Sequence, residues 1–211
     1  MRKIITIQHT QSEQHVNKMI GSLGDWNLTE HGIIQAKNIG KNLCDEIRDS
    51  KYVMYSSDLP RAKQTAEILS DYINITPKFS PLLREMDLGA ANGKTKEWAK
   101  KNSLCPLWPG TIDWAQNIDD RVFKNAESKR DVWFRVQLFY DKYIKELDEN
   151  IIIVSHDGFL SILFAWWLEM DIEMLNKCNL SGKSGGVSLL YEDQLGSRGI
   201  KKLNDMSYIQ F

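Results

Sequence analysis

Short apolar runs rich in β-branched residues alternate along this chain with longer stretches of helical spacing. The runs cover residues 3–7, 52–55 and 151–154, and polar residues follow each of them. Short strand-like runs separated by long helical stretches are typical of parallel strands joined by crossover helices. The pattern therefore predicts an α/β fold, with a mostly parallel central sheet in a three-layer α/β/α sandwich.

The first two helical stretches have clear starting signals. Apolar residues repeat at helical spacing from Ile33 to Ile47, after Thr29, which is placed to cap the helix. After the second strand, Ser57 or Asp58 can cap the next helix, and Pro60 fits its first turn. We expect helices at about 29–49 and from residue 60 onward.

Helical spacing returns in the second half of the chain. It covers residues 131–148, and the apolar stretch 159–168 is typical of a buried helix. Two short strands at about 186–191 and 199–203, joined around Gly196, complete the predicted elements. With 211 residues and 42% hydrophobic content, one core is the default, so we expect a single domain over residues 1–211.

Residues 80–129 break the alternation of strands and helices. Prolines and glycines are scattered through this segment, with Trp98, Trp108 and Trp114 among charged residues. We interpret it as an irregular excursion with one helix at about 95–101, lying over the site as a lid. Either the tryptophans cover a ligand, or they anchor a surface loop to the core.

Residues suited to phosphate chemistry follow three predicted strands. Gln8 and His9 follow the first, Ser57 through Arg61 follow the second, and His156 follows the third. Ligands in such sheets bind beyond the carboxyl ends of the strands, so these side chains are predicted to meet. Arg61 would also sit at a helix N-terminus, where backbone amides favour an anion. Two imidazoles and a guanidinium at one edge indicate an enzyme of phosphoryl chemistry.

Composition narrows the classes of partner and location. A formal net charge of -1 gives no general attraction to nucleic acid or to an anionic membrane. The longest apolar stretch is far shorter than the roughly 20 residues that span a bilayer. The three cysteines form no CxxC pair, their number is odd, and no signal peptide opens the chain, so we expect a cytoplasmic protein.

Six short motifs, in order, resemble those of the histidine phosphatase superfamily, the group that includes phosphoglycerate mutase-like enzymes. The segment 8–12 with Asn17 resembles the family's Arg-His-Gly block, and 28–40 its Leu-Thr-x-x-Gly-x-x-Gln-Ala block. The segment 57–66 is close to the Ser-x-Leu-x-Arg-Ala-x-Gln-Thr-Ala block. Further on, 83–89, 127–128 and 154–158 resemble the proton-donor, Gly-Glu-Ser and second-histidine blocks.

The first motif departs from the family pattern at two positions. Gln8 stands where the family has an arginine, and Thr10 where it has a glycine. Glutamine donates through its amide but carries no charge and forms no bidentate guanidinium–phosphate pair. If nothing compensates, phosphate binding and turnover should be weaker. Arg84 and Lys94 are the nearest candidates by motif position to supply the missing charge.

The resemblance implies a mechanism and a role for each matching residue. His9 would attack phosphorus and form a phosphohistidine, while Glu85 would protonate the departing oxygen and later activate water. Phosphoryl oxygens would be bound by a set of five residues, with His156 also counted as catalytic: Gln8, Asn17, Ser57, Arg61 and His156. Glu127 would support the site by hydrogen bonding.

No metal ion or cofactor is expected at this site. The cationic clamp does what a metal would do, and a zinc site of His9, His15 and His156 lacks carboxylate or thiolate partners at familiar spacing. His15 and His31 are interpreted as structural or exposed.

Three functions remain open. The leading one is a phosphatase acting on a small phosphorylated substrate. The second is a phosphoglycerate-type mutase, although the modest excursion over 80–129 favours hydrolysis. The third is a degenerate protein that binds a phosphorylated ligand without turnover, for which Gln8 and Thr10 are the evidence. The oligomeric state is also open, with a homodimer as one alternative.

Overall fold

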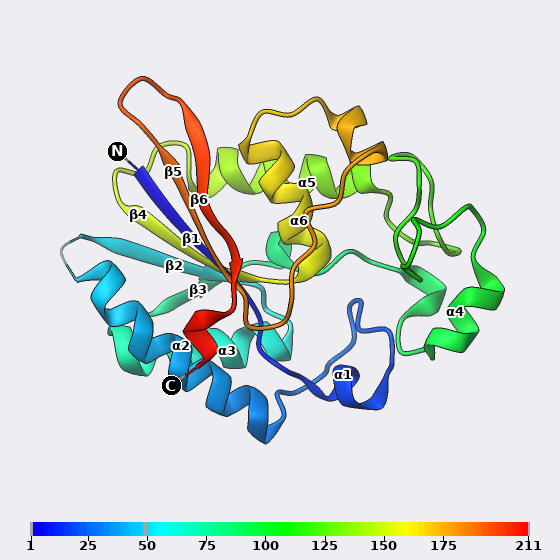
Figure 1. Cartoon of the computed structure of the whole chain (residues 1–211), viewed down its shortest axis with the longest axis horizontal. Coiled ribbons are helices and arrows are strands. Elements are labelled where there is room, and N and C mark those ends of the chain that lie inside the picture. Colours follow the sequence, from blue (N-terminus) through cyan, green and yellow to red (C-terminus); the bar gives the residue numbers. More distant parts are fainter. Residues whose placement is uncertain (1, 49, 211) are drawn as a thin grey trace.

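The computed structural model describes residues 2–48 and 50–210, and its centre is a six-stranded sheet in the order β3-β2-β4-β1-β5-β6 (Figure 1). The neighbouring pairs β2–β3, β2–β4 and β1–β4 are parallel, whereas β5 is antiparallel to both β1 and β6. The strands are β1 (Arg2–Gln8), β2 (Tyr52–Ser56), β3 (Pro77–Phe79), β4 (Asn150–Ser155), β5 (Val187–Glu192) and β6 (Arg198–Asp205). The mostly parallel α/β fold predicted from the sequence is confirmed.

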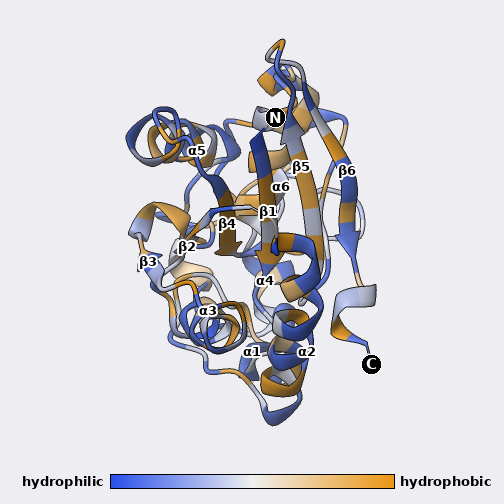
Figure 2. Cartoon of the chain, turned by 90° about the vertical axis from the view of Figure 1, so that its left-hand side faces the viewer, coloured by the Kyte–Doolittle hydropathy of each residue, from blue (hydrophilic) through white to orange (hydrophobic). Residues whose placement is uncertain are grey.

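Helices cover both faces of this sheet. The α-helices are α1 (Glu13–Asn17), α2 (Glu30–Ile47), α3 (Pro60–Ile73), α4 (Lys96–Asn102), α5 (Lys129–Tyr143) and α6 (Asp157–Trp167). Short 3-10 helices are η1 (Pro81–Leu83), η2 (Gly89–Ala91), η3 (Ile172–Asn176) and η4 (Ser207–Ile209). Figure 2 shows α2 and α3 on one side of the sheet and α5 on the other.

The central strands bury side chains on both faces, which explains their continuous apolar runs. In β1, Ile4 belongs to the core cluster beside α5 and α6, whereas Ile5 belongs to the cluster beside α2 and α3. In β4 the same division separates Ile151 from Ile152. Strand residues point alternately to opposite faces, so one run of isoleucines supplies two cores.

The start of α3 differs in detail from the expectation. Pro60 is its first residue, as predicted, but Leu59 occupies the cap position. The Ser57 hydroxyl accepts a weak bond from the Leu59 amide at 3.3 Å. Asp58 caps nothing, because its carboxylate instead accepts two bonds of 2.7 Å from the Arg84 guanidinium.

The segment 80–129 contributes apolar residues to the core on one face of the sheet. Its helix α4 covers 96–102, close to the predicted 95–101, and its apolar residues join the core beside α5 and α6. Trp98 packs against Phe123, with ring centroids 5.8 Å apart. Lys129 Nζ lies 5.2 and 5.1 Å from the ring centroids of Trp108 and Trp114. Trp114 belongs to the core beside α5 and α6, and Trp98 and Trp108 pack against that core, so all three tryptophans anchor the segment, whether or not they also cover a ligand.

Candidate active site

Three neighbouring strands bring the predicted residues to one edge of the sheet. Gln8 at the end of β1 lies opposite Ser155 at the end of β4, and β2 ends beside β4. The residues that follow are therefore neighbours, and the ring centroids of His9 and His156 are 5.0 Å apart. The convergence expected from parallel strand ends is present in the fold.

A cavity of about 520 Å³ opens at this edge. His9, Gln8 and Glu85 line it, together with residues from several other parts of the chain: 14–15, 19–22, 86, 88, 96, 110–114, 157–158 and 182–184. Arg61, Ser57 and His156 are fully buried and lie outside this lining. The cavity thus has His9 on its wall, with Arg61 and His156 packed behind it.

His9 is held with one ring nitrogen ready for attack. Its Nδ1 lies 2.8 Å from the Thr10 carbonyl oxygen, which can only accept, so Nδ1 carries the proton. The lone pair then resides on Nε2, which accepts a bond of 3.1 Å from Arg61 Nε. Burial, followed by the charge of Arg61, lowers the pKa of His9 well below its usual range. The imidazole is consequently neutral at neutral pH, as a nucleophile must be.

Arg61 joins the site to the loop that precedes α2. Its Nη1 donates to the Gly24 carbonyl at 2.9 Å and its Nη2 donates to the Ser22 carbonyl at 2.8 Å. Burial lowers the pKa of Arg61 to about 10, so the guanidinium keeps its charge at neutral pH. Because a guanidinium has five N–H donors, further donors remain available for phosphoryl oxygens.

His156 is positioned by Ser57. Its Nε2 and the Ser57 hydroxyl oxygen are 2.8 Å apart, and its Nδ1 has no hydrogen-bond partner among the residues described by the structure. Burial, then the charge of Arg61, lowers the pKa of His156 well below its usual range. A second neutral imidazole with an unpaired nitrogen therefore lies behind His9.

Glu85 lines the cavity as a buried acid. Its Oε1 accepts from the Met86 amide at 2.8 Å, and its Oε2 is 3.4 Å from the Gly158 amide. Burial raises the pKa of Glu85 to about 7, against the opposing effect of the Met86 hydrogen bond. A carboxyl with this pKa exchanges its proton near neutral pH, which suits a general acid that later becomes a base.

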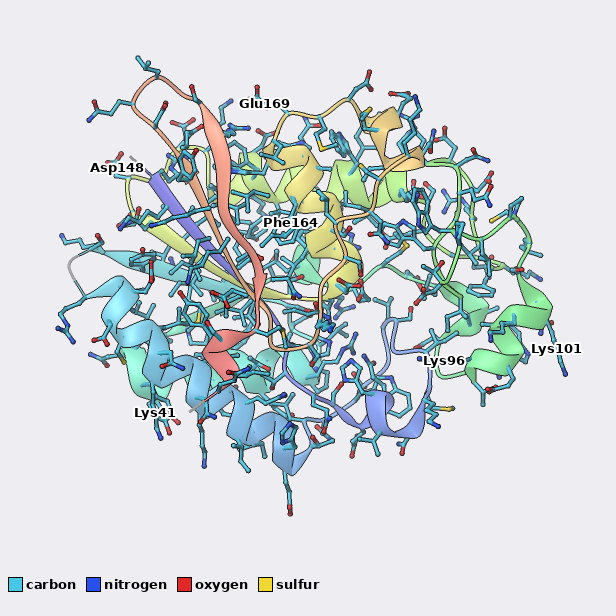
Figure 3. All side chains as sticks on the ribbon, in the orientation of Figure 1. Lys41, Lys96, Lys101, Asp148, Phe164 and Glu169 are labelled. Atoms are coloured by element: carbon cyan, nitrogen blue, oxygen red, sulfur yellow. The ribbon has the colours of Figure 1, made fainter. Side chains whose placement is uncertain are left out.

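Three residues with basic side chains line the cavity but were not assigned to it from the sequence. His15 stacks on His9 with ring centroids 5.5 Å apart, and Lys96 and Lys183 also line the cavity. The Ser12 amide donates to His15 Nδ1 at 3.0 Å, which leaves Nε2 as the protonated nitrogen. Figure 3 shows Lys96 at the end of α4 that lies nearer to α1.

Three other residues considered from the sequence lie away from this cavity. Asn17, expected to bind phosphate, is exposed at the end of α1 and is not part of the lining. Lys94 is also exposed, and Arg84 forms an ion pair with Asp58 at 2.7 Å. None of the three adds charge to the cavity wall. His15 and Lys96 were missed because they lie in the short helices α1 and α4, and sequence spacing alone does not show where these helices sit relative to the strand ends.

Two aspartates add acidity to the same wall. The Asp157 carboxylate accepts from the Gly182 amide at 2.6 Å and from the Ser181 hydroxyl. Burial raises the pKa of Asp157, and burial followed by the charge of Asp157 raises that of Asp113. The cavity wall therefore carries both acidic and basic side chains.

Over residues 2–48 and 50–210, no group of three or more His, Cys, Asp or Glu side chains has a geometry that could hold a metal ion. In the same ranges, no helix has the length and apolar character required to cross a membrane.

Known proteins share this fold over nearly the whole length of the chain. A phosphoserine phosphatase mutant from Entamoeba histolytica, solved in complex with phosphoserine, has a TM-score of 0.76 at 20% identity and matches 100% of both chains. "Putative phosphoserine phosphatase 2" of Hydrogenobacter thermophilus is 24% identical over 205 residues, covering 92% of this chain and 97% of that protein.

A mutase is similar to the chain over almost the same length. The 2,3-bisphosphoglycerate-dependent phosphoglycerate mutase of Bartonella bacilliformis is 26% identical over 213 residues, covering 95% of this chain and 97% of that enzyme. The sequence model of the histidine phosphatase superfamily (branch 1) matches residues 4–205. With nearly its whole length matched, this chain belongs to the histidine phosphatase superfamily, branch 1.

Proposed function

We propose that this protein is a metal-independent phosphomonoester phosphatase that forms a phosphohistidine on His9. One observation carries the proposal: a neutral His9 with a fixed tautomer and a Glu85 with a pKa of about 7 line the same cavity. A nucleophile and a matched proton donor are the two groups that hydrolysis of a phosphate ester requires.

In the first step, the lone pair on His9 Nε2 forms a bond to phosphorus while the ester P–O bond breaks. The Glu85 carboxyl gives its proton to the departing oxygen, which leaves as the alcohol. In the free protein Arg61 Nε–H donates a hydrogen bond of 3.1 Å to His9 Nε2. For His9 to attack, this donor has to turn to a phosphoryl oxygen instead, which is a short movement. Its charge then screens the transferring group.

In the second step, water attacks the phosphohistidine. The Glu85 carboxylate takes the proton of that water, the P–N bond breaks, and its electron pair returns to His9. Inorganic phosphate leaves with both residues in their starting protonation states. The single acid therefore serves both steps without a net change in the enzyme.

The phosphate clamp we propose differs from the one expected from the sequence. Gln8 occupies the position of the family's arginine as a neutral donor, and Arg61 and His156 remain as binding groups. The stacked His15 ring, with Nε2 protonated, takes the place that we had expected Asn17 to fill. Ser57 contributes mainly by orienting His156 through their 2.8 Å contact.

A phosphoglycerate-type mutase is the second candidate, because the Bartonella bacilliformis mutase is similar over nearly the full length of this chain. The same His9 chemistry would then pass the phosphoryl group back to an organic acceptor instead of water. A purely binding protein is disfavoured, since binding requires neither a neutral nucleophile nor an acid buried at a free-energy cost.

The test compares His9→Ala with His31→Ala, which removes an exposed imidazole of α2. Purified proteins are given ethyl phosphate and nitrophenyl phosphate, with and without 3-phosphoglycerate as an organic acceptor, and inorganic phosphate and organic phosphate products are measured separately. We expect phosphate release by wild type and His31→Ala, and a loss of roughly a thousandfold or more in His9→Ala. Normal turnover by His9→Ala would refute the nucleophile, and transfer to 3-phosphoglycerate without phosphate release would favour the mutase.

A further inference from the structure

The guanidinium of Arg135, in α5, is shared between the Glu127 carboxylate and the backbone segment that carries Glu85. Its Nε and Nη2 donate to the two Glu127 carboxylate oxygens at 3.1 and 2.9 Å. Its Nη1 donates to the carbonyls of Leu82 at 3.0 Å and Arg84 at 2.6 Å, and its Nη2 donates to the Glu85 carbonyl at 3.2 Å. All five N–H donors of the guanidinium are used.

Glu127 extends this clamp to the far side of Glu85. Its carboxylate accepts from the Asp87 amide at 2.8 Å, and its own amide donates to the Asp87 carbonyl at 2.7 Å. The ion pair therefore holds the backbone on both sides of the acid. Arg135 and Glu127 side chains are only 14% and 25% exposed, so solvent screens their interaction little.

The same guanidinium also packs on the helix that contacts the acid's side chain. It lies 5.3 Å from the Phe159 ring centroid, and the amide of the preceding Gly158 faces Glu85 Oε2 at 3.4 Å. On the opposite side, the Ser155 hydroxyl donates to the Leu83 carbonyl at 2.8 Å. The position of the carboxyl relative to the second-histidine strand is thus set by contacts that converge on segment 82–87.

We propose that Arg135 is a positioning residue for the Glu85 general acid, an inference that rests on the proposed phosphatase function. Without its guanidinium, three carbonyls lose their donors and the Glu127 carboxylate keeps only the Asp87 amide, which leaves buried acceptors unpaired. The segment relieves the cost of these unpaired acceptors by moving toward water. Proton transfer needs hydrogen-bond reach, and a displacement of about 1 Å can cost roughly a hundredfold in rate.

The experiment compares Arg135→Met with Arg130→Met. Both residues lie in α5 and both lose an ion pair, since Arg130 contacts Asp119 at 2.6 Å. Arg130 makes no contact with segment 82–87 among the described residues. The readouts are kcat/KM on ethyl phosphate and on nitrophenyl phosphate from pH 5 to pH 9, with thermal unfolding as the test of folding.

We expect Arg135→Met to lower kcat/KM on ethyl phosphate at least tenfold more than on nitrophenyl phosphate, whose leaving group hardly needs a proton. The alkaline limb of its pH profile of kcat/KM should also shift. Arg130→Met should keep the wild-type ratio of the two kcat/KM values and the wild-type alkaline limb. A merely structural arginine would lower both activities equally and leave the limb in place, which would overturn the proposal. Failure of the proposed function looks different, because wild type itself would then release no phosphate.

Two further variants keep the proposal testable if Arg135→Met does not fold. Arg135→Lys retains the charge but cannot reach all of the carbonyls, so it should show the same substrate selectivity to a smaller degree. Glu127→Gln retains an acceptor for the Asp87 amide while it weakens the hold on the guanidinium. Wild-type selectivity and pH profile in both folded variants would overturn the assignment.

Discussion

Replacing Glu85 by glutamine should separate substrates by the proton demand of their leaving groups. Glutamine keeps the shape and can still accept the Met86 amide bond, but it has no proton to give. The ethyl oxygen of ethyl phosphate must leave as an alkoxide unless an acid protonates it. The nitrophenolate released from nitrophenyl phosphate is stable without a proton. A general acid contributes about 10²–10⁴-fold in rate, so we expect a loss of that size on ethyl phosphate and less than about tenfold on nitrophenyl phosphate.

The pKa of Glu85 gives this prediction a pH dependence of definite sign. Burial raises that pKa to about 7, so about nine-tenths of the carboxyl is protonated at pH 6 and about one-tenth at pH 8. The advantage of wild type over Glu85→Gln on ethyl phosphate should therefore shrink roughly tenfold from pH 6 to pH 8. Dividing the kcat/KM of wild type by that of Glu85→Gln cancels the titration of the substrate phosphate, because that titration affects both enzymes equally.

The assay is kcat/KM on both esters across that pH range, because kcat/KM reports the free enzyme and the first irreversible step. Equal losses on the two esters at every pH would refute the assignment of the acid. Asp157 would then be the next candidate, since it also lines the cavity and burial raises its pKa.

The remaining predictions concern charge, metal and space at the site. Gln8→Arg should raise kcat/KM on a generic phosphomonoester roughly tenfold or more by adding a charged donor; a decrease would show Gln8 tuned to a particular ligand. A strong chelator should leave turnover unchanged, because Arg61 and the cavity lysines supply the positive charge; activity lost to chelator and restored by zinc or magnesium would contradict this. Gly158→Ala should favour the helix by propensity yet lower ethyl phosphate turnover roughly tenfold, because the new Cβ would lie 2.6 Å from Glu85 Oε1; unchanged turnover would show that the acid has room to shift.

Sequence patterns predicted the parts of the site that local structure determines. The β-branched runs define β1, β2 and β4, and residues just past their ends had to meet once the strands were parallel. The position of Arg61 in the first turn of a helix was predicted from Pro60, which marks the start of α3. For His9 and His156, a strand end and its neighbours were enough to predict their proximity.

The residues that depend on loop paths could not be predicted in this way. His15 stacks on His9 because the polar loop returns to the site, held there by Arg61 bonds to the Ser22 and Gly24 carbonyls. Nothing in the local sequence distinguishes it from Asn17, which lies outside the cavity lining. Arg135 showed only as a polar position on an amphipathic helix, since its carbonyl acceptors lie about fifty residues earlier in the chain.

Short elements escaped prediction for a related reason. Strand β3 covers only Pro77–Phe79, begins with a proline and lies at the edge of the sheet, where the missing N–H costs no ladder bond. Helix α1 covers only Glu13–Asn17, too few residues to show a helical period. Pairing with a neighbouring element, rather than local preference, stabilises elements of this length.

Trapping the phosphoenzyme tests the central claim most directly. Wild type is mixed with a radiolabelled phosphomonoester, quenched within milliseconds in alkaline detergent, where phosphohistidine survives, and digested for mass spectrometry. We predict one phosphoryl group on His9, labile to acid, formed and discharged as fast as turnover, and absent from His9→Ala while His31→Ala forms it normally. Phosphate release at the wild-type rate with no label on His9, or with the label on another residue, would contradict the account.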